Sequence, residues 1–148
     1  MAILQQSATF PAPLSSDIRL LEGHMKILIA DDKRHVRREL RHQIEAHPGW
    51  AVCTEAEDGV QAVNRAKQFK PDLVILDLAM PELNGFEAAG QISKALPGVP
   101  ILMLTLYASP LVEKEAEKLG IQRVISKSTA YMLLPAIEEA FAQVNHET

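Results

Sequence analysis

The chain has 148 residues, 47% of them hydrophobic, so it can bury one complete core but is too short for two ordinary domains. Its formal net charge of -4 argues against nucleic-acid binding as the main function, although it is compatible with a local basic patch. Cys53 is the only cysteine, which rules out an internal disulfide and is typical of a buried thiol in the reducing cytoplasm.

Residues 1–24 differ in character from the rest of the sequence. They contain several prolines and serines but lack the basic start and the apolar stretch of a secretory signal, so we expect a loose leader or extension. Apolar runs elsewhere fall far short of the ~20 residues that cross a bilayer, so we expect no membrane span. The domain itself is expected over residues 25–145, with a tail of residues 146–148.

From Met25 onward, strand-like and helical patterns alternate, as is typical of a doubly wound α/β domain. A first strand is expected over residues 26–30 and a second over residues 51–56. The helix between them is indicated by apolar residues at every fourth position, namely Val36, Leu40 and Ile44. The helix after the second strand is expected to turn an apolar stripe inward, namely Val60, Val63 and Ala66.

The second half of the domain repeats this alternation. Further strands are expected over residues 73–76, 99–106 and 123–126. Two helices separate them, over residues 85–96 and 109–119. The sequence therefore predicts five strands, each followed by a helix.

A last helix carries its apolar residues on one side, and Pro135 must lie in its first turn or kink it. Its apolar residues are Leu133, Ile137, Phe141 and Val144. Five βα units with right-handed crossovers predict a three-layer α/β sandwich with a parallel sheet in the strand order 2-1-3-4-5.

Acidic residues follow two of the predicted strands. Asp77 comes directly after the third strand, where its carboxylate could attack a phosphorus atom or could simply serve as a turn residue. Asp31 and Asp32 follow the first strand, and one of them could cap the next helix. A cap needs only one carboxylate, whereas Mg²⁺ takes one or two carboxylates together with waters and phosphate oxygens. We therefore favour a metal and phosphate site.

Two further polar residues end predicted strands. Lys127 ends the fifth strand, where its ammonium could lie beside a phosphoryl oxygen, although a lysine there could also just reach solvent. Thr105 lies near the end of the fourth strand and could donate a hydrogen bond to a phosphoryl group, although a strand threonine is ordinarily a packing residue. Because parallel strand ends share one edge of the sheet, these side chains are expected to converge with the three carboxylates.

The order and spacing of these residues resemble the receiver domain of two-component response regulators, over residues 25–145. Receivers of the subfamily with a helix-turn-helix output domain are the most similar, on the run 102–107, the pair Gly120-Ile121 and the pair Lys127-Ser128. The resemblance implies a flavodoxin-like fold and a cytoplasmic signalling protein that depends on phosphorylation.

The resemblance also implies roles for the site residues. Asp77 would be the phosphoacceptor, and Thr105 and Lys127 would contact the phosphoryl group. Mg²⁺ would be bound directly by Asp32, Asp77 and the backbone carbonyl of Ala79, while Asp31 would act mostly through water.

Partners follow from the same resemblance. The donor would be a sensor histidine kinase or a phosphotransfer protein, and phosphorylation would change binding to an output partner or favour a homodimer. Direct binding of nucleic acid by this domain is not expected. The domain would catalyse only its own phosphorylation and dephosphorylation.

Two alternatives remain at this point. The first is an interaction module that keeps the fold without being phosphorylated, against which the intact set of site residues counts. The second is a phosphatase of the haloacid dehalogenase type, but such enzymes place a second Asp two residues after the nucleophile. Here Leu78 and Ala79 follow Asp77.

The sequence also departs from many receivers. Val124 stands where an aromatic switch residue is common, so a switch that relies on that ring is in doubt, and Ser128 replaces a frequent proline. Leu106 and Tyr107 follow Thr105, where a small residue is usual. We expect these two bulky side chains to restrict water near an acyl phosphate and to lengthen its lifetime.

Overall fold

The computed structural model describes residues 22–146, and most of the predicted leader and the end of the predicted tail lie outside this range. Its strands form one parallel sheet in the order β2-β1-β3-β4-β5, which confirms the predicted fold class and strand order. The strands are β1 (Met25–Ala30), β2 (Trp50–Ala56), β3 (Leu73–Leu76), β4 (Ile101–Thr105) and β5 (Arg123–Ser126).

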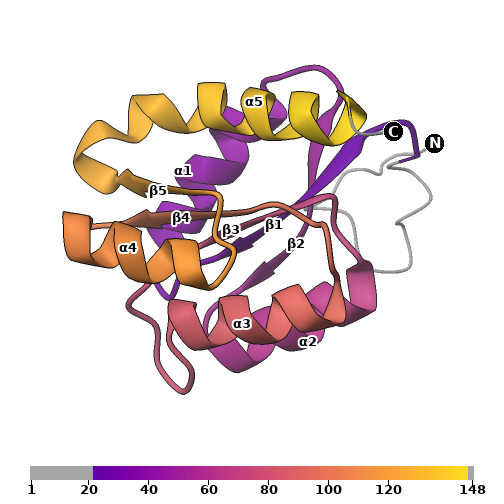
Figure 1. Cartoon of the computed structure of the whole chain (residues 1–148). Coiled ribbons are helices and arrows are strands. Elements are labelled where there is room, and N and C mark those ends of the chain that lie inside the picture. The colour runs from indigo at the N-terminus through magenta and orange to yellow at the C-terminus, as the bar shows by residue number, and fades with distance from the viewer. Residues whose placement is uncertain (1–21, 147–148) are drawn as a thin grey trace.

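Helices cover both faces of this sheet (Figure 1). Helices α1 and α5 lie on one face, α2 and α3 on the other, and α4 packs beside β5 at the sheet edge. A 3-10 helix, η3 (Lys127–Met132), connects β5 to α5. The bounds are α1 (Arg34–Glu45), α2 (Gly59–Phe69), α3 (Gly85–Ala95), α4 (Pro110–Lys118) and α5 (Leu133–His146).

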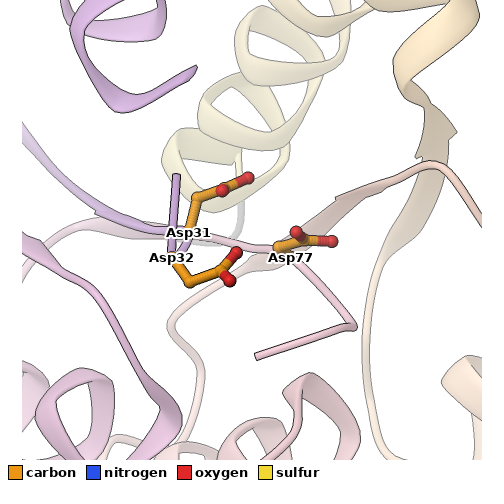
Figure 2. Close-up of side chains that lie close together, drawn as sticks. All are labelled: Asp31, Asp32 and Asp77. Atoms are coloured by element: carbon orange, nitrogen blue, oxygen red, sulfur yellow. The ribbon is translucent and has the colours of Figure 1, made fainter. Parts of the chain in front are cut away.

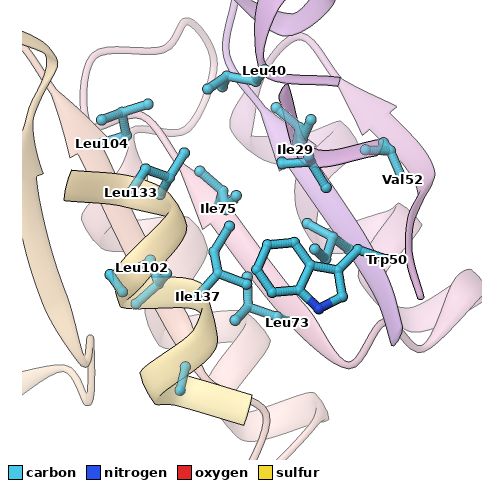
Figure 3. Packing of buried hydrophobic residues seen from close by; sticks show 14 of the residues in the cluster. Ile29, Leu40, Trp50, Val52, Leu73, Ile75, Leu102, Leu104, Leu133 and Ile137 are labelled. Atoms are coloured by element: carbon cyan, nitrogen blue, oxygen red, sulfur yellow. The ribbon is translucent and has the colours of Figure 1, made fainter. Parts of the chain in front are cut away.

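Each face of the sheet buries its own apolar layer. On the α1 and α5 face, Leu133 and Ile137 are fully buried against Leu73, Ile75 and their neighbours (Figure 3). Pro135 lies in the first turn of α5, where its missing N–H breaks no intrahelical bond. The sheet is therefore held from both sides, which fixes the strand ends that carry the polar residues.

Polar caps set the starts of α2 and α3. The Asp58 side chain accepts a hydrogen bond from the backbone N–H of Gln61 at the start of α2. Asn84 and Glu87 form a reciprocal capping box at the start of α3. Both caps follow loops that leave the carboxyl edge of the sheet, so they determine where those loops end.

Two expected details are wrong. Val60 is 46% exposed, although it is expected in the inward stripe of α2. Gly59, not Val60, begins that stripe, because the helical spacing puts it on the same face as the other buried residues. These are Ala62, Val63 and Ala66. The strand expected over residues 99–106 is the shorter β4, so Leu106 lies beyond the sheet and is exposed.

A register shift interrupts the pairing of β1 with β2. Ile27 lies opposite Val52 and Leu28 opposite Thr54, so Cys53 has no partner. An extra residue of this kind reverses the side-chain alternation beyond it, and the shift places Glu55 opposite Ile29. As a result, Glu55 points to the α1 face, where α1 side chains contact it.

The thiol of Cys53 is buried and free, as expected. Burial raises its pKa to about 11, so the thiol is protonated and unreactive at neutral pH. Within residues 22–146, no helix is long and apolar enough to cross a bilayer.

Replacement of Ile137 by Ala should lower the free energy of unfolding by about 2–5 kcal/mol, because it removes a fully buried side chain between α5 and the sheet. Leu111→Ala is the control, since Leu111 is 73% exposed and should change stability by no more than about 0.5 kcal/mol. Urea unfolding of both variants measures the difference, and equal effects would contradict this account of the core.

Candidate functional site

The candidate site lies at the carboxyl edge of the sheet. Ala30 pairs with Leu76 in register, so the next residues, Asp31 and Asp77, leave the sheet side by side. The backbone N–H of Asp77 donates to the carbonyl of Ala30 over 2.9 Å, which ties the two strand ends together.

Three carboxylates meet at this edge (Figure 2). One oxygen of each of Asp31, Asp32 and Asp77 lies within 4.8 Å of the others. Asp31 and Asp77 are buried, whereas Asp32 is exposed to solvent. A cluster of this size could hold one cation, with the buried Asp31 and Asp77 on its inner side and solvent on its outer side.

Lys127 follows β5 directly and reaches two of the acids with its side chain. Its ammonium donates to Asp31 over 2.7 Å and to Asp77 over 3.1 Å. Burial alone would lower the pKa of Lys127, yet these hydrogen bonds hold it above its usual value, so the side chain stays charged. Behind it, Ser126 accepts a hydrogen bond from the backbone N–H of Ser128 and thereby starts η3.

Asp77 is the carboxyl group that the site perturbs most clearly. Burial raises its pKa, the charge of Asp31 adds to the rise, and the hydrogen bond from Lys127 opposes it. One of its oxygens, Oδ1, is buried and has no hydrogen-bond partner among the described residues. An acceptor in that state costs stability until a cation or a hydrogen-bond donor reaches it.

The donor set therefore fits Mg²⁺, which prefers carboxylate oxygens and retains waters. Ala79 is exposed in the loop that follows Asp77, and its backbone lies close enough to the Asp77 carboxyl to affect the pKa of that group. The loop is packed tightly at its far end, because a side chain at Gly85 would place its Cβ 2.3 Å from the Asp77 carbonyl oxygen. Glycine at this position lets the end of the loop pack against the main chain of Asp77 and Leu78.

Thr105 ends β4 and is fully buried. Its hydroxyl oxygen accepts a hydrogen bond from the backbone N–H of Tyr107 over 3.2 Å, so in this structure it is engaged by its own loop. Leu106 and Tyr107 of that loop are 64% and 60% exposed. The structure thus gathers the three acids and places Lys127 in contact with Asp31 and Asp77. The recorded hydrogen bond of the Thr105 hydroxyl is made within the β4–α4 loop.

Sequence reasoning missed two residues that support the site. Arg37 donates to the main-chain carbonyl of Asp31 over 2.8 Å and to the carboxylate of Glu55 over 2.9 Å. The helical spacing of the arginines in α1 was visible in the sequence, but their partner was not, since the register shift in β2 decides which face Glu55 occupies.

Comparison with known proteins identifies the family of this domain. The family model for the response regulator receiver domain matches residues 27–137. A transcriptional regulatory protein of Bacillus subtilis, YdfI, is 38% identical over 105 residues, which cover 71% of this chain and 49% of the relative. A second, PdtaR of Mycobacterium tuberculosis, is 34% identical over 125 residues, which cover 83% of this chain and 60% of the relative.

Solved structures show the same fold. A LuxR-family two-component response regulator from Aurantimonas superposes with a TM-score of 0.78 at 31% identity, over 81% of this chain and 86% of that one. Among the curated sequence relatives, a protein-glutamate methylesterase/protein-glutamine glutaminase of Pyrococcus horikoshii is 37% identical over 86 residues. These cover 58% of this chain and only 23% of the relative. The chain thus spans about half or less of the length of the first curated relatives that it matches.

Asp77→Asn should stabilise the metal-free protein at neutral pH. Because the folded state holds the Asp77 proton more tightly than the unfolded chain, the cost of ionising Asp77 appears as the pH rises through its raised pKa. The free energy of unfolding of the wild type minus that of the variant should therefore fall from acid to neutral pH in EDTA. Chemical denaturation across this range measures it, and a difference that grows with pH would contradict the direction.

Proposed function

Because the chain belongs to the response regulator receiver domain family, we propose that Asp77 accepts a phosphoryl group and that this modification changes what the domain binds. The observation that supports the proposal most strongly is the buried Oδ1 of Asp77, which lacks a hydrogen-bond partner among residues 22–146 and lies beside two further carboxylates and an ammonium. Asp77 would thus act as the nucleophile, and the excess negative charge around it leaves room for a bound cation.

The transfer step needs little covalent chemistry from the protein. An oxygen of Asp77 attacks the phosphorus of a phosphohistidine, the new O–P bond replaces the P–N bond, and the imidazole leaves with the electrons of the broken bond. Lys127 already donates to Asp77 and would hold the ammonium beside the incoming phosphoryl oxygens. The ordered strand ends keep both groups in place.

Asp31, Asp32, Asp77 and the carbonyl of Ala79 would hold Mg²⁺, with Asp31 acting mostly through water. When bound, the ion supplies positive charge to a site that gains about -1.5 to -2 units on phosphorylation. The site holds three carboxylates and only one ammonium, so it carries an excess of negative charge. A bound Mg²⁺ would balance that excess.

The response would start at Thr105. Its hydroxyl oxygen accepts from Tyr107 N–H and keeps its own O–H to donate to a phosphoryl oxygen, so a movement of the hydroxyl toward that oxygen would draw the β4–α4 loop with it. A shift from mostly inactive to mostly active requires roughly 5.5 kcal/mol of differential interaction, which new bonds from Thr105, Lys127 and backbone amides would supply in large part.

The proposed partners are a sensor histidine kinase or phosphotransfer protein as donor and an output partner as receiver of the signal, in the cytoplasm. A homodimer of phosphorylated copies is part of the same proposal. The domain would bind no nucleic acid itself, and its only catalysis would be its own Mg²⁺-dependent phosphorylation and dephosphorylation.

Incubation with acetyl phosphate and Mg²⁺ should add the mass of one phosphoryl group, read by intact mass spectrometry. The gain should disappear in Asp77→Asn and in the wild type with EDTA. If a folded wild type that binds Mg²⁺ gains no mass, the receiver proposal fails and an interaction module without phosphorylation takes its place.

Leu106→Ala should speed the loss of the phosphoryl group by about two- to fivefold, which corresponds to under about 1 kcal/mol in barrier height. The reason is that the bulky residues after Thr105 are expected to restrict water at the acyl phosphate. Leu111→Ala is the matched control, because Leu111 is also an exposed leucine but lies in α4, outside the loop that follows Thr105. Dephosphorylation that slows in Leu106→Ala, measured by mass over time, would count against the idea.

A further inference from the structure

We infer that Arg37 is a positioning residue for the metal site, because its guanidinium fixes the peptide unit between Asp31 and Asp32 and so directs the Asp32 carboxylate. The inference rests on the proposed function, since it concerns the same Mg²⁺ site. Arg37 belongs to α1 and touches none of the three carboxylates in its described contacts.

The guanidinium of Arg37 bridges two strand ends. Its Nη1 donates to the main-chain carbonyl of Asp31 over 2.8 Å, and its Nε donates to Glu55 Oε1 over 2.9 Å. The side chain is only 14% exposed, so both bonds are shielded from competing water. Arg37 therefore links the end of β1 to the end of β2 through one rigid, planar group.

Glu55 is itself held firmly. Arg41 donates to its second carboxylate oxygen over 2.7 Å, and Arg65 donates to its main-chain carbonyl. Burial alone would raise the pKa of Glu55, but the hydrogen bonds from Arg41 and Arg37 lower it below its usual value. Glu55 is thus a fixed carboxylate that holds the guanidinium group of Arg37 in place.

The planarity of the peptide bond carries this restraint to Asp32. The carbonyl of Asp31 shares one rigid plane with the N and Cα atoms of Asp32, so fixing the oxygen fixes that plane. The other side of Asp31 is held by its N–H, which donates to the carbonyl of Ala56 over 3.0 Å. The backbone leading to Asp32 is consequently restrained by hydrogen bonds on both sides of Asp31.

Asp32 depends on this support more than its neighbours do. Asp31 accepts hydrogen bonds from Lys33 N–H and Lys127, and Asp77 accepts one from Lys127. The described contacts of the Asp32 carboxylate are limited to a 3.8 Å approach of Lys33, with the side chain 33% exposed. Figure 2 shows this carboxylate turned toward Asp77, and among its described contacts only Lys33 approaches it, so its place depends largely on the position of its own backbone.

Arg37→Lys isolates this role because it keeps the charge but replaces a fork with a single ammonium, which cannot reproduce both donations in the same geometry. Arg38→Lys is the matched control on the same helix. Arg38 is exposed, and among residues 22–146 its side chain makes no recorded ion pair or hydrogen bond.

The test is a titration of the full chain with Mn²⁺, followed by electron paramagnetic resonance. Arg37→Lys should weaken Mn²⁺ binding by about tenfold, as loss of a supporting partner commonly does, while Arg38→Lys should stay within about twofold of the wild type. With acetyl phosphate, Arg37→Lys should need more Mg²⁺ but recover a near wild-type rate at saturation. A merely structural role would leave metal affinity unchanged in the folded variant.

Glu55→Gln provides a second variant in case Arg37→Lys does not fold, as judged by circular dichroism. It removes the charge that anchors the fork, and a folded variant should bind Mn²⁺ several-fold more weakly. Wild-type affinity in either folded variant would overturn the role of Arg37 while leaving the proposed function intact. Failure of the wild type itself to bind Mn²⁺ would overturn the metal site and this inference together.

Discussion

The contact on which the site depends is the Lys127 ammonium between Asp31 and Asp77. Burying two carboxylates beside each other is unfavourable unless a positive charge joins them, and breaking such a pair leaves an uncompensated charge. The parallel sheet supplies the solution, because it brings the ends of β1, β3 and β5 to one edge. One ammonium does not neutralise three carboxylates, however, so the fold leaves a place for further positive charge.

Much of this architecture could be predicted from the sequence, because runs of Ile, Leu and Val mark buried parallel strands and polar residues mark their ends. The acids, Lys127 and Thr105 were all predicted in this way, and the structure brings the acids and Lys127 to one edge of the sheet. The contacts of Arg37 with Glu55 could not be found, since strict alternation along β2 would turn Glu55 away from α1. The extra residue Cys53, which has no partner on β1, reverses that alternation. No pattern in the sequence indicates that β2 contains this irregularity.

The exposed β4–α4 loop separates the buried site from the surface. Thr105 is fully buried and bonded to its own loop, whereas the next two side chains point to solvent. A change at the hydroxyl would therefore reach the surface within two residues. Val124 on the neighbouring β5 is a small, half-buried side chain, so no aromatic ring there can report the change.

The two halves of the site are far apart in the chain, since Lys127 follows Asp31 by 96 residues and Asp77 by 50. During synthesis the carboxylates leave the ribosome long before their counter-charge, and a nascent chain that stops before β5 cannot assemble the pocket. Completion of the site therefore has to wait for β5, the last strand along the sequence. Only a protein with its final strand in place can be competent to receive a signal.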